Sequence, residues 1–156
     1  MDVVHAKATE IEAWILLARE VEPLFGPMAD NIDFQATLRQ AIASNTAFCI
    51  SSEPHGNNRE LIGGVVISKE TNEITWLAVS KKYRGKGSGQ KLVEFALGML
   101  NFQKNIFVQT FDKSVPEGTS ARNLYSGFGF SDLKDGGLNP AGVPTVIMQL
   151  ENYRGI

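Results

Sequence analysis

The 156-residue sequence has one cysteine, two histidines and no apolar run approaching the ~20 residues that a membrane-spanning helix needs. A single cysteine, Cys49, excludes an internal disulfide and a cysteine-based zinc site. His5 and His55 lie far apart without metal-ligand spacing, so we expect no metal site. The first residues lack a basic segment followed by an apolar one. We therefore expect no signal peptide, and a cytoplasmic protein.

Neither sign of charge dominates the composition. Seventeen acidic residues against fifteen basic ones leave a formal net charge of -2. Such a chain has no overall attraction to nucleic acid or to an anionic membrane, so we expect neither as a partner. Hydrophobic residues make up 43% of the chain, which is enough for a core of normal size. The length is typical of one domain, and we expect residues 1–156 to form it.

Apolar periodicity predicts a mixed α/β fold. Two early helices precede most of the strands and are placed to form a flap over one end of a sheet. The predicted strands are 3–8, 47–51, 61–68, 73–79, 106–108, 130–133 and 143–150, and the predicted helices are 11–21, 33–42, 92–100 and 121–128.

The most informative segment joins an apolar strand to a helix through a basic, glycine-rich turn. Arg84, Gly87 and Gly89 form the pattern R-x-x-G-x-G directly after the strand that ends at Val79. A glycine-rich turn that opens a helix presents unpaired main-chain N–H groups at the positive end of the helix dipole, which suits a phosphate. The segment does not match the P-loop pattern, which needs a Lys after the last glycine where this chain has Gln90. It does not match the dinucleotide fingerprint either, because that pattern, read from Gly85, needs a Gly at position 90.

Positive charge is concentrated at the same place, which favours a small phosphorylated ligand over a long polyanion. Five of the fifteen basic residues fall within eleven positions, and no acidic residue lies between Glu73 and Glu94. These bases are Lys81, Lys82, Arg84, Lys86 and Lys91.

The pattern resembles the pyrophosphate-binding motif of the GNAT acetyltransferase superfamily. A second match follows at Ala121–Phe130, where A-R-N-L-Y-S-G-F-G-F resembles the end of a helix in that family. The resemblance covers roughly residues 60–134. It implies an α/β (α+β) fold with a mixed, mostly antiparallel sheet of about seven strands. Helices would cover both faces, and the sheet would be splayed beside the strand that ends at Val79.

The resemblance also implies acetyl-CoA as co-substrate, no metal, and a set of site residues. Leu77, Ala78 and Val79 would pair with the pantetheine arm, and an amide near Val79 would polarise the thioester carbonyl. Tyr125 would protonate the leaving thiolate, and Glu73 would be the general base. The pyrophosphate would lie on the amides of Arg84, Gly85, Lys86, Gly87, Ser88 and Gly89.

A second reason to consider Glu73 as the general base comes from the chemistry of the reaction and the position of the residue in its strand. A protonated amine must lose a proton before it attacks, so a carboxylate within reach is useful. Strand periodicity predicts Glu73, Thr75, Leu77 and Val79 on one face, running from the acid to the thioester. A solvated carboxylate at a strand end explains Glu73 equally well. The family's cofactor-contacting Asn is replaced here by Gly118, seven residues before Tyr125.

The predicted activity is acetyl transfer to a primary amine by direct attack, with a small amine or amino acid as acceptor. Asp30, Asp33, Asp132 and Asp135 would suit a cationic acceptor. Two alternatives remain: a non-catalytic acyl-CoA-binding module, and an acetyltransferase acting on a protein partner, which an open cleft beside residues 23–35 would favour. Residues 143–150 would pair two copies into a homodimer if they lie at a sheet edge.

Overall fold

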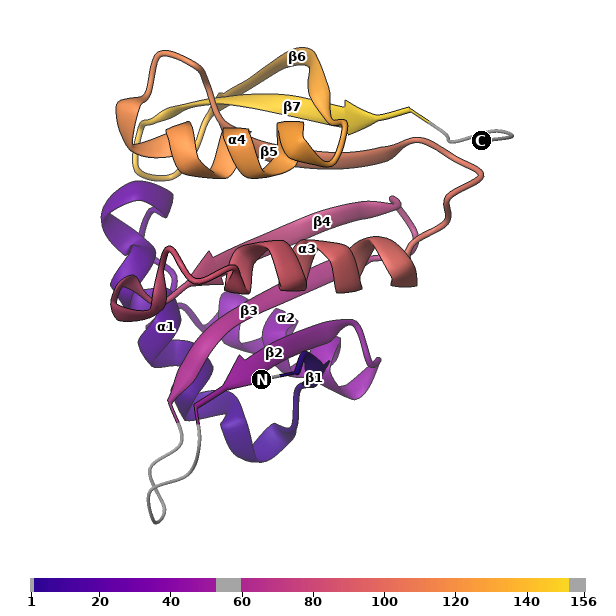
Figure 1. Cartoon of the computed structure of the whole chain (residues 1–156). Coiled ribbons are helices and arrows are strands. Elements are labelled where there is room, and N and C mark those ends of the chain that lie inside the picture. Colours follow the sequence, from indigo (N-terminus) through magenta and orange to yellow (C-terminus); the bar gives the residue numbers. More distant parts are fainter. Residues whose placement is uncertain (1, 53–59, 152–156) are drawn as a thin grey trace.

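The computed structural model describes residues 2–52 and 60–151 and contains one seven-stranded sheet with helices on both faces (Figure 1). The strand order is β1-β2-β3-β4-β5-β7-β6. The strands are β1 (Val4–His5), β2 (Ala47–Ser51), β3 (Leu61–Ser68), β4 (Glu73–Val79), β5 (Ile106–Phe111), β6 (Ser131–Leu138) and β7 (Pro144–Leu150). The helices are α1 (Ile11–Phe25), α2 (Ile32–Ala43), α3 (Ser88–Met99) and α4 (Thr119–Gly127), with 3₁₀ turns η1 (Ala8–Glu10), η2 (Lys81–Tyr83) and η3 (Pro116–Gly118). His55 lies outside the described residues.

Two hydrophobic cores lie on opposite faces of the sheet. On one face α1 and α2 pack through Trp14, which is fully buried. The ring of Trp14 lies so close to β3 that a Cβ at Gly64 would come within 2.5 Å of it. On the other face α3 contributes Leu92, and a Cβ at Gly63 would come within 2.8 Å of that side chain. The paired glycines of β3 therefore let one helix approach from each side.

The pairing of β3 with β4 contains a register shift at Thr75, and the shift changes which side chains share a face. Ile67 pairs with Ile74 and Val66 with Trp76, so Thr75 is the extra residue of a β-bulge. Leu77 and Val79 consequently join Ile74 in the core beneath α3. Glu73 is adjacent to Ile74 and lies by alternation on the opposite face, which α1 and α2 cover. The expectation that Glu73, Thr75, Leu77 and Val79 share a face is wrong.

The sheet is splayed between β4 and β5, as predicted. These parallel strands pair only at Glu73 with Phe107 and Ile74 with Val108. Asn72 closes this end: its side-chain amide donates to the carbonyl oxygens of Asn101 and Asn105 at 3.0 and 2.9 Å. Beyond Ile74 the strands separate into the two halves seen in Figure 1.

In the second half of the sheet, the edge strand is not the one that was predicted. β7 lies between β5 and β6 and pairs with both, so residues 143–150 do not form an edge. The edge is β6, which carries Asp132, Lys134 and Asp135 and two register shifts against β7. Charges and bulges are the features by which edge strands resist pairing with a second chain.

Two further sequence expectations concern membranes and metals. In the part of the chain that the structure describes, no helix has the length and hydropathy to cross a bilayer. The same residues contain no group of three or more His, Cys, Asp or Glu side chains arranged to hold a metal ion.

Candidate active site

The open end of β4 presents main-chain groups to the space that β5 has left. The main-chain N–H of Ser80 donates to the carbonyl of Ile62 on β3 at 2.8 Å. Successive residues of a strand turn their main-chain groups to opposite sides, so this bond shows which residues of β4 face β3. By that alternation Ala78 faces β3, whereas Leu77 and Val79 turn their N–H and C=O groups toward the splay. The carbonyl of Val79 accepts from Nε of Arg84 at 3.1 Å. Of the three residues predicted to pair with pantetheine, Leu77 and Val79 therefore offer main-chain groups on the open side, and Ala78 does not.

The chain leaves β4 through η2 and enters α3 on a loop with unpaired amides. Among the described residues, no main-chain N–H from Gly85 to Gln90 donates a hydrogen bond, and the first helical bond runs from Lys91 to Gly87 at 3.1 Å. Gly85 and Gly87 have φ of +78° and +85°, which residues with a Cβ rarely adopt. A run of free amides at a helix start has the geometry and the dipole to bind an anion.

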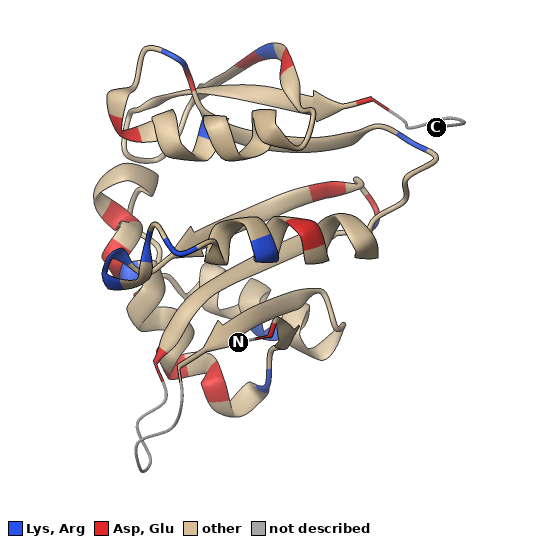
Figure 2. Cartoon of the chain, in the orientation of Figure 1, with Lys and Arg blue, Asp and Glu red and all other residues tan. Residues whose placement is uncertain are grey.

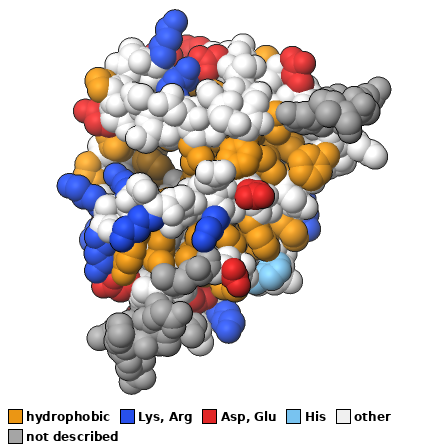
Figure 3. All heavy atoms as spheres, viewed as in Figure 1, with side chains coloured by type: hydrophobic (Ala, Val, Ile, Leu, Met, Phe, Trp, Pro, Cys, Tyr) orange, Lys and Arg blue, Asp and Glu red, His pale blue; other side chains and the backbone are white. Residues whose placement is uncertain are grey.

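The third glycine of the motif serves packing rather than backbone conformation. A Cβ on Gly89 would lie 3.2 Å from Leu124 of α4 and 3.7 Å from Val79. The first turn of α3 therefore lies against both the end of β4 and α4. In Figure 3, hydrophobic side chains line the groove that separates the two halves of the sheet.

Lysine and arginine gather around the start of α3 (Figure 2). Lys82 is partly neutralised by Glu60, 2.7 Å away, and this contact raises the pKa of Lys82 and lowers that of Glu60 through hydrogen bonding and charge attraction. Glu20 of α1 accepts from the amide of Lys81 at 2.6 Å and thereby attaches α1 to the loop. Nothing in the sequence pattern marked Glu20 for this role.

Tyr125 of α4 lies in the same core as Leu77 and Val79. It is 4% exposed, and its ring packs edge-on against Phe130 with centroids 5.7 Å apart. Burial raises the pKa of Tyr125 above its ordinary value near 10, so the phenol keeps its proton at neutral pH. A protonated phenol is the form that a proton donor requires.

Glu73 lies at the closed end of β4 and on the other face from Tyr125. Its carboxylate accepts from the hydroxyl of Thr71 at 2.7 Å. Val79 is six positions along β4 from Glu73, about 20 Å of strand. The structure therefore places Tyr125 in the same core as Leu77 and Val79, and Glu73 outside that core.

The C-terminal end of α1 and the β6–β7 connection meet across the splay. The side-chain amide of Asn139, in the β6–β7 connection, donates to the carbonyl of Leu24 at 2.8 Å. Gly26 lies against Pro140 and leaves no room for a Cβ, which would come within 2.5 Å of that proline. The ring of Phe25 then contacts Trp76 of β4 and Phe111 of β5, with centroids 6.5 and 5.6 Å apart. The flap formed by residues 23–35 is thus closed against the β6–β7 connection.

The replacement of Asn by Gly118 has a steric cause. A Cβ on Gly118 would lie 2.3 Å from Cβ of Phe111 and 2.8 Å from its ring. A side chain at position 118 is incompatible with the position of Phe111, which reaches Phe25 on the other side of the splay.

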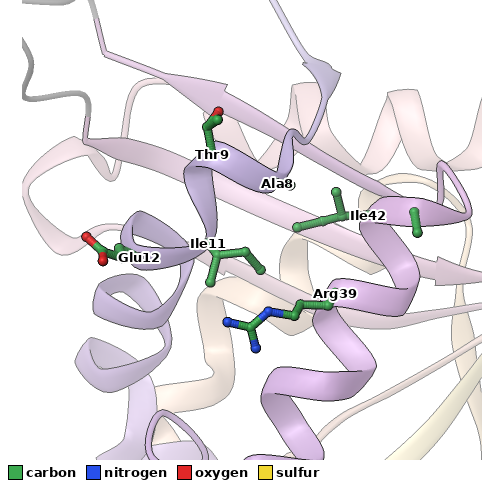
Figure 4. Close-up of a pocket in the computed structure, with 7 residues that line it drawn as sticks. Ala8, Thr9, Ile11, Glu12, Arg39 and Ile42 are labelled. Atoms are coloured by element: carbon green, nitrogen blue, oxygen red, sulfur yellow. The ribbon is translucent and has the colours of Figure 1, made fainter.

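A separate hollow of about 420 Å³ lies at the other end of α1 (Figure 4). It is lined by Ile11, Glu12, Arg39 and Ile42, among others. α1 is 15 residues long, which is about 22 Å, so this hollow is remote from Phe25 and the splay.

Comparison with protein-family models matches residues 45–132 to the acetyltransferase (GNAT) domain. The match covers more than half of the chain and includes β4, the amide-rich loop and α4. The chain belongs to the GNAT acetyltransferase family. As a GNAT protein it is an N-acetyltransferase. Comparison with curated proteins finds no match.

Solved structures share the GNAT fold over nearly the whole chain. An N-acetyltransferase from Staphylococcus aureus Mu50 has a TM-score of 0.73 at 14% identity, covering 97% of this chain and 98% of that one. A chain of the NatC complex bound to Gag peptide and CoA has a TM-score of 0.69 at 19% identity, covering 97% and 99%. The paia N-acetyltransferase from Thermoplasma acidophilum, in complex with coenzyme A, has a TM-score of 0.67 at 16% identity, covering 96% and 98%.

Proposed function

We propose that this GNAT protein transfers the acetyl group of acetyl-CoA to a small primary amine by direct attack in a ternary complex. One observation carries the proposal: the main-chain groups of Leu77 and the N–H of Val79, which face the splay, lie on the strand that leads into the unpaired amides of Gly85–Gln90. The amide groups of pantetheine can pair with the main-chain groups of β4, as an added strand does. The pyrophosphate can accept hydrogen bonds from the unpaired amides of the loop.

The reaction would proceed at the splay. The amine nitrogen attacks the thioester carbonyl carbon, so that a C–N bond forms and the C–S bond breaks. The amine gives its proton to Glu73 through a chain of waters, because Glu73 lies four residues along β4 from Leu77, about 13 Å of strand. Tyr125 protonates the departing thiolate. An amide from Leu77 or Val79 stabilises the negative oxygen of the intermediate. The products are an N-acetyl amine and CoA with a free thiol.

Direct attack is preferred over a covalent acetyl-enzyme. Cys49, the single cysteine of the chain, is fully buried on β2 among the side chains beneath α1. A nucleophilic cysteine has to reach the substrate as an accessible thiolate. The contact of Leu24 with Asn139 supports a small acceptor over a wide protein-binding cleft.

The proposal is tested by two measurements on the full chain: thermal stabilisation by CoA, and release of free thiol from acetyl-CoA with a panel of primary amines. We expect both. Stabilisation without thiol release from any amine would identify a non-catalytic acyl-CoA-binding module. Absence of stabilisation would contradict the assignment of the α3 loop.

Replacing Glu73 tests the proposed base. Glu73→Gln is expected to lower kcat/KM for the amine about 100-fold at neutral pH, because the protonated amine loses its proton acceptor. The deficit should shrink as the pH approaches ~10, where free amines are already deprotonated. Glu70→Gln, at an exposed neighbouring carboxylate, is the matched control and should leave the rate unchanged. A Glu73→Gln enzyme with the wild-type pH profile would remove Glu73 from the mechanism.

A further inference from the structure

Four aromatic side chains surround one another on the α1–α2 face of β4, and we name them the acceptor-side aromatic cluster: Trp14, Phe25, Phe34 and Trp76. Trp76 is at its centre, with ring centroids 5.7 Å from Trp14, 6.5 Å from Phe25 and 6.3 Å from Phe34. Trp14 is fully buried, whereas the other three are partly exposed. The cluster therefore presents an accessible aromatic surface supported by a rigid base.

The cluster borders the splay. Trp76 is one residue from Leu77, whose main chain faces the gap, and Phe25 extends the aromatic surface to Phe111 on β5. Glu73 lies on the same face of β4. An amine that reaches the thioester from this face passes the rings with Glu73 beside it.

The cluster also holds two polar atoms without partners. Among the described residues, Nε1 of Trp14 and Nε1 of Trp76 are buried and form no hydrogen bond. Since both atoms are covered by protein, no ligand atom reaches them, and these indoles offer a ligand their rings alone.

The carboxylates around this face are occupied by the protein itself. Glu22 accepts from the amides of Met28 and Ala29 at 2.7 and 3.1 Å. Asp30 forms a double hydrogen bond with Arg19 at 3.0 Å, and that contact lowers the carboxyl pKa of Asp30. The other engaged acids are Glu20, with Lys81 and Ser80; Asp132, with Arg122; and Asp135, with the amide of Gly137.

Asp33, at the start of α2, is exposed and lies ~100° around that helix from Phe34. Glu73 accepts a hydrogen bond from the hydroxyl of Thr71 but, among the described residues, has no basic partner, so its negative charge is left to meet an ammonium group. The expectation that Asp30 and Asp132 favour a cationic acceptor loses its basis, since each of these side chains is paired with an arginine.

Resting on the proposed function, we propose that the acceptor is an arylalkyl primary amine. Its ring packs on the partly exposed rings of Trp76, Phe25 and Phe34. Aromatic rings gain from offset and edge-on contacts with one another beyond the area they bury. A polyamine would bring several charges to a face where Asp30 and Asp132 are already paired with arginines.

The chain offers an internal reporter for the test, because its two tryptophans are both in this cluster. We would titrate the CoA-saturated protein with phenethylamine and follow tryptophan fluorescence, with butylamine and spermidine as comparisons. Phenethylamine is expected to give a saturable change and to bind at least about 10-fold more tightly than the other two.

Phe34→Ala should weaken phenethylamine binding about 10-fold and raise the amine KM without changing the KM for acetyl-CoA. Phe102→Ala, at a 47% exposed phenylalanine beyond α3, is the matched control and should change neither. Equal binding of butylamine or spermidine, or an unaffected Phe34→Ala protein, would overturn this inference while leaving acetyl transfer intact. Phenethylamine binding without thiol release would instead contradict the proposed function and support the aromatic site.

Discussion

Tyr125→Phe is expected to slow acetyl transfer at least about 100-fold while leaving CoA affinity unchanged. The substitution removes the one proton that Tyr125 can donate, and loss of a general acid costs about this factor. The ring contact with Phe130 is retained, so the core around α4 should stay packed. Steady-state kinetics and calorimetric titration with CoA measure the two quantities separately.

The same variant has a second, independent signature at high pH. Because burial raises the pKa of Tyr125 in the folded protein, its stabilising contribution is complete below the unfolded value near 10 and declines as the pH rises toward the folded value. Thermal unfolding of wild type should therefore lose stability above pH ~10 more steeply than that of Tyr125→Phe. Unchanged turnover alongside this difference would show that the tyrosine is buried as described but takes no part in catalysis.

Ser88→Asp is expected to abolish CoA binding at ordinary concentrations while making the free protein more stable. Ser88 is the first residue of α3, next to the unpaired amides. A carboxylate there interacts favourably with the helix dipole, by about 0.3–1 kcal/mol. It also repels a pyrophosphate at close range by about 3 kcal/mol, which is a loss of affinity of roughly 100-fold or more.

The opposite signs of these two effects make the result specific to an anion site. Ser88→Ala is the control, and we expect little change in either quantity because the serine hydroxyl forms no hydrogen bond within the described residues. Differential scanning calorimetry and CoA titration on each protein are sufficient. Undiminished CoA binding by Ser88→Asp would place the pyrophosphate elsewhere.

The sequence determined those features that depend on near neighbours. The apolar face of Leu92, Val93, Ala96 and Leu97 predicted α3, and all four side chains are buried. The glycine-rich loop could also be predicted, since a positive φ at Gly87 and the free amides of a helix start depend on residues close in sequence. The family pattern around Arg84 and Tyr125 then led to the splayed seven-stranded sheet, which the structure has.

Tertiary structure alone decided the features that depend on contacts between distant segments. Periodicity placed Glu73 with Leu77, but the bulge at Thr75 arises from the register with β3 and reverses the face. The edge strand, the steric reason for Gly118 and the aromatic cluster around Trp76 likewise depend on residues that meet only after folding. Local conformational preferences are encoded over a few residues, whereas strand order, register and side-chain neighbours are selected by packing of the whole chain.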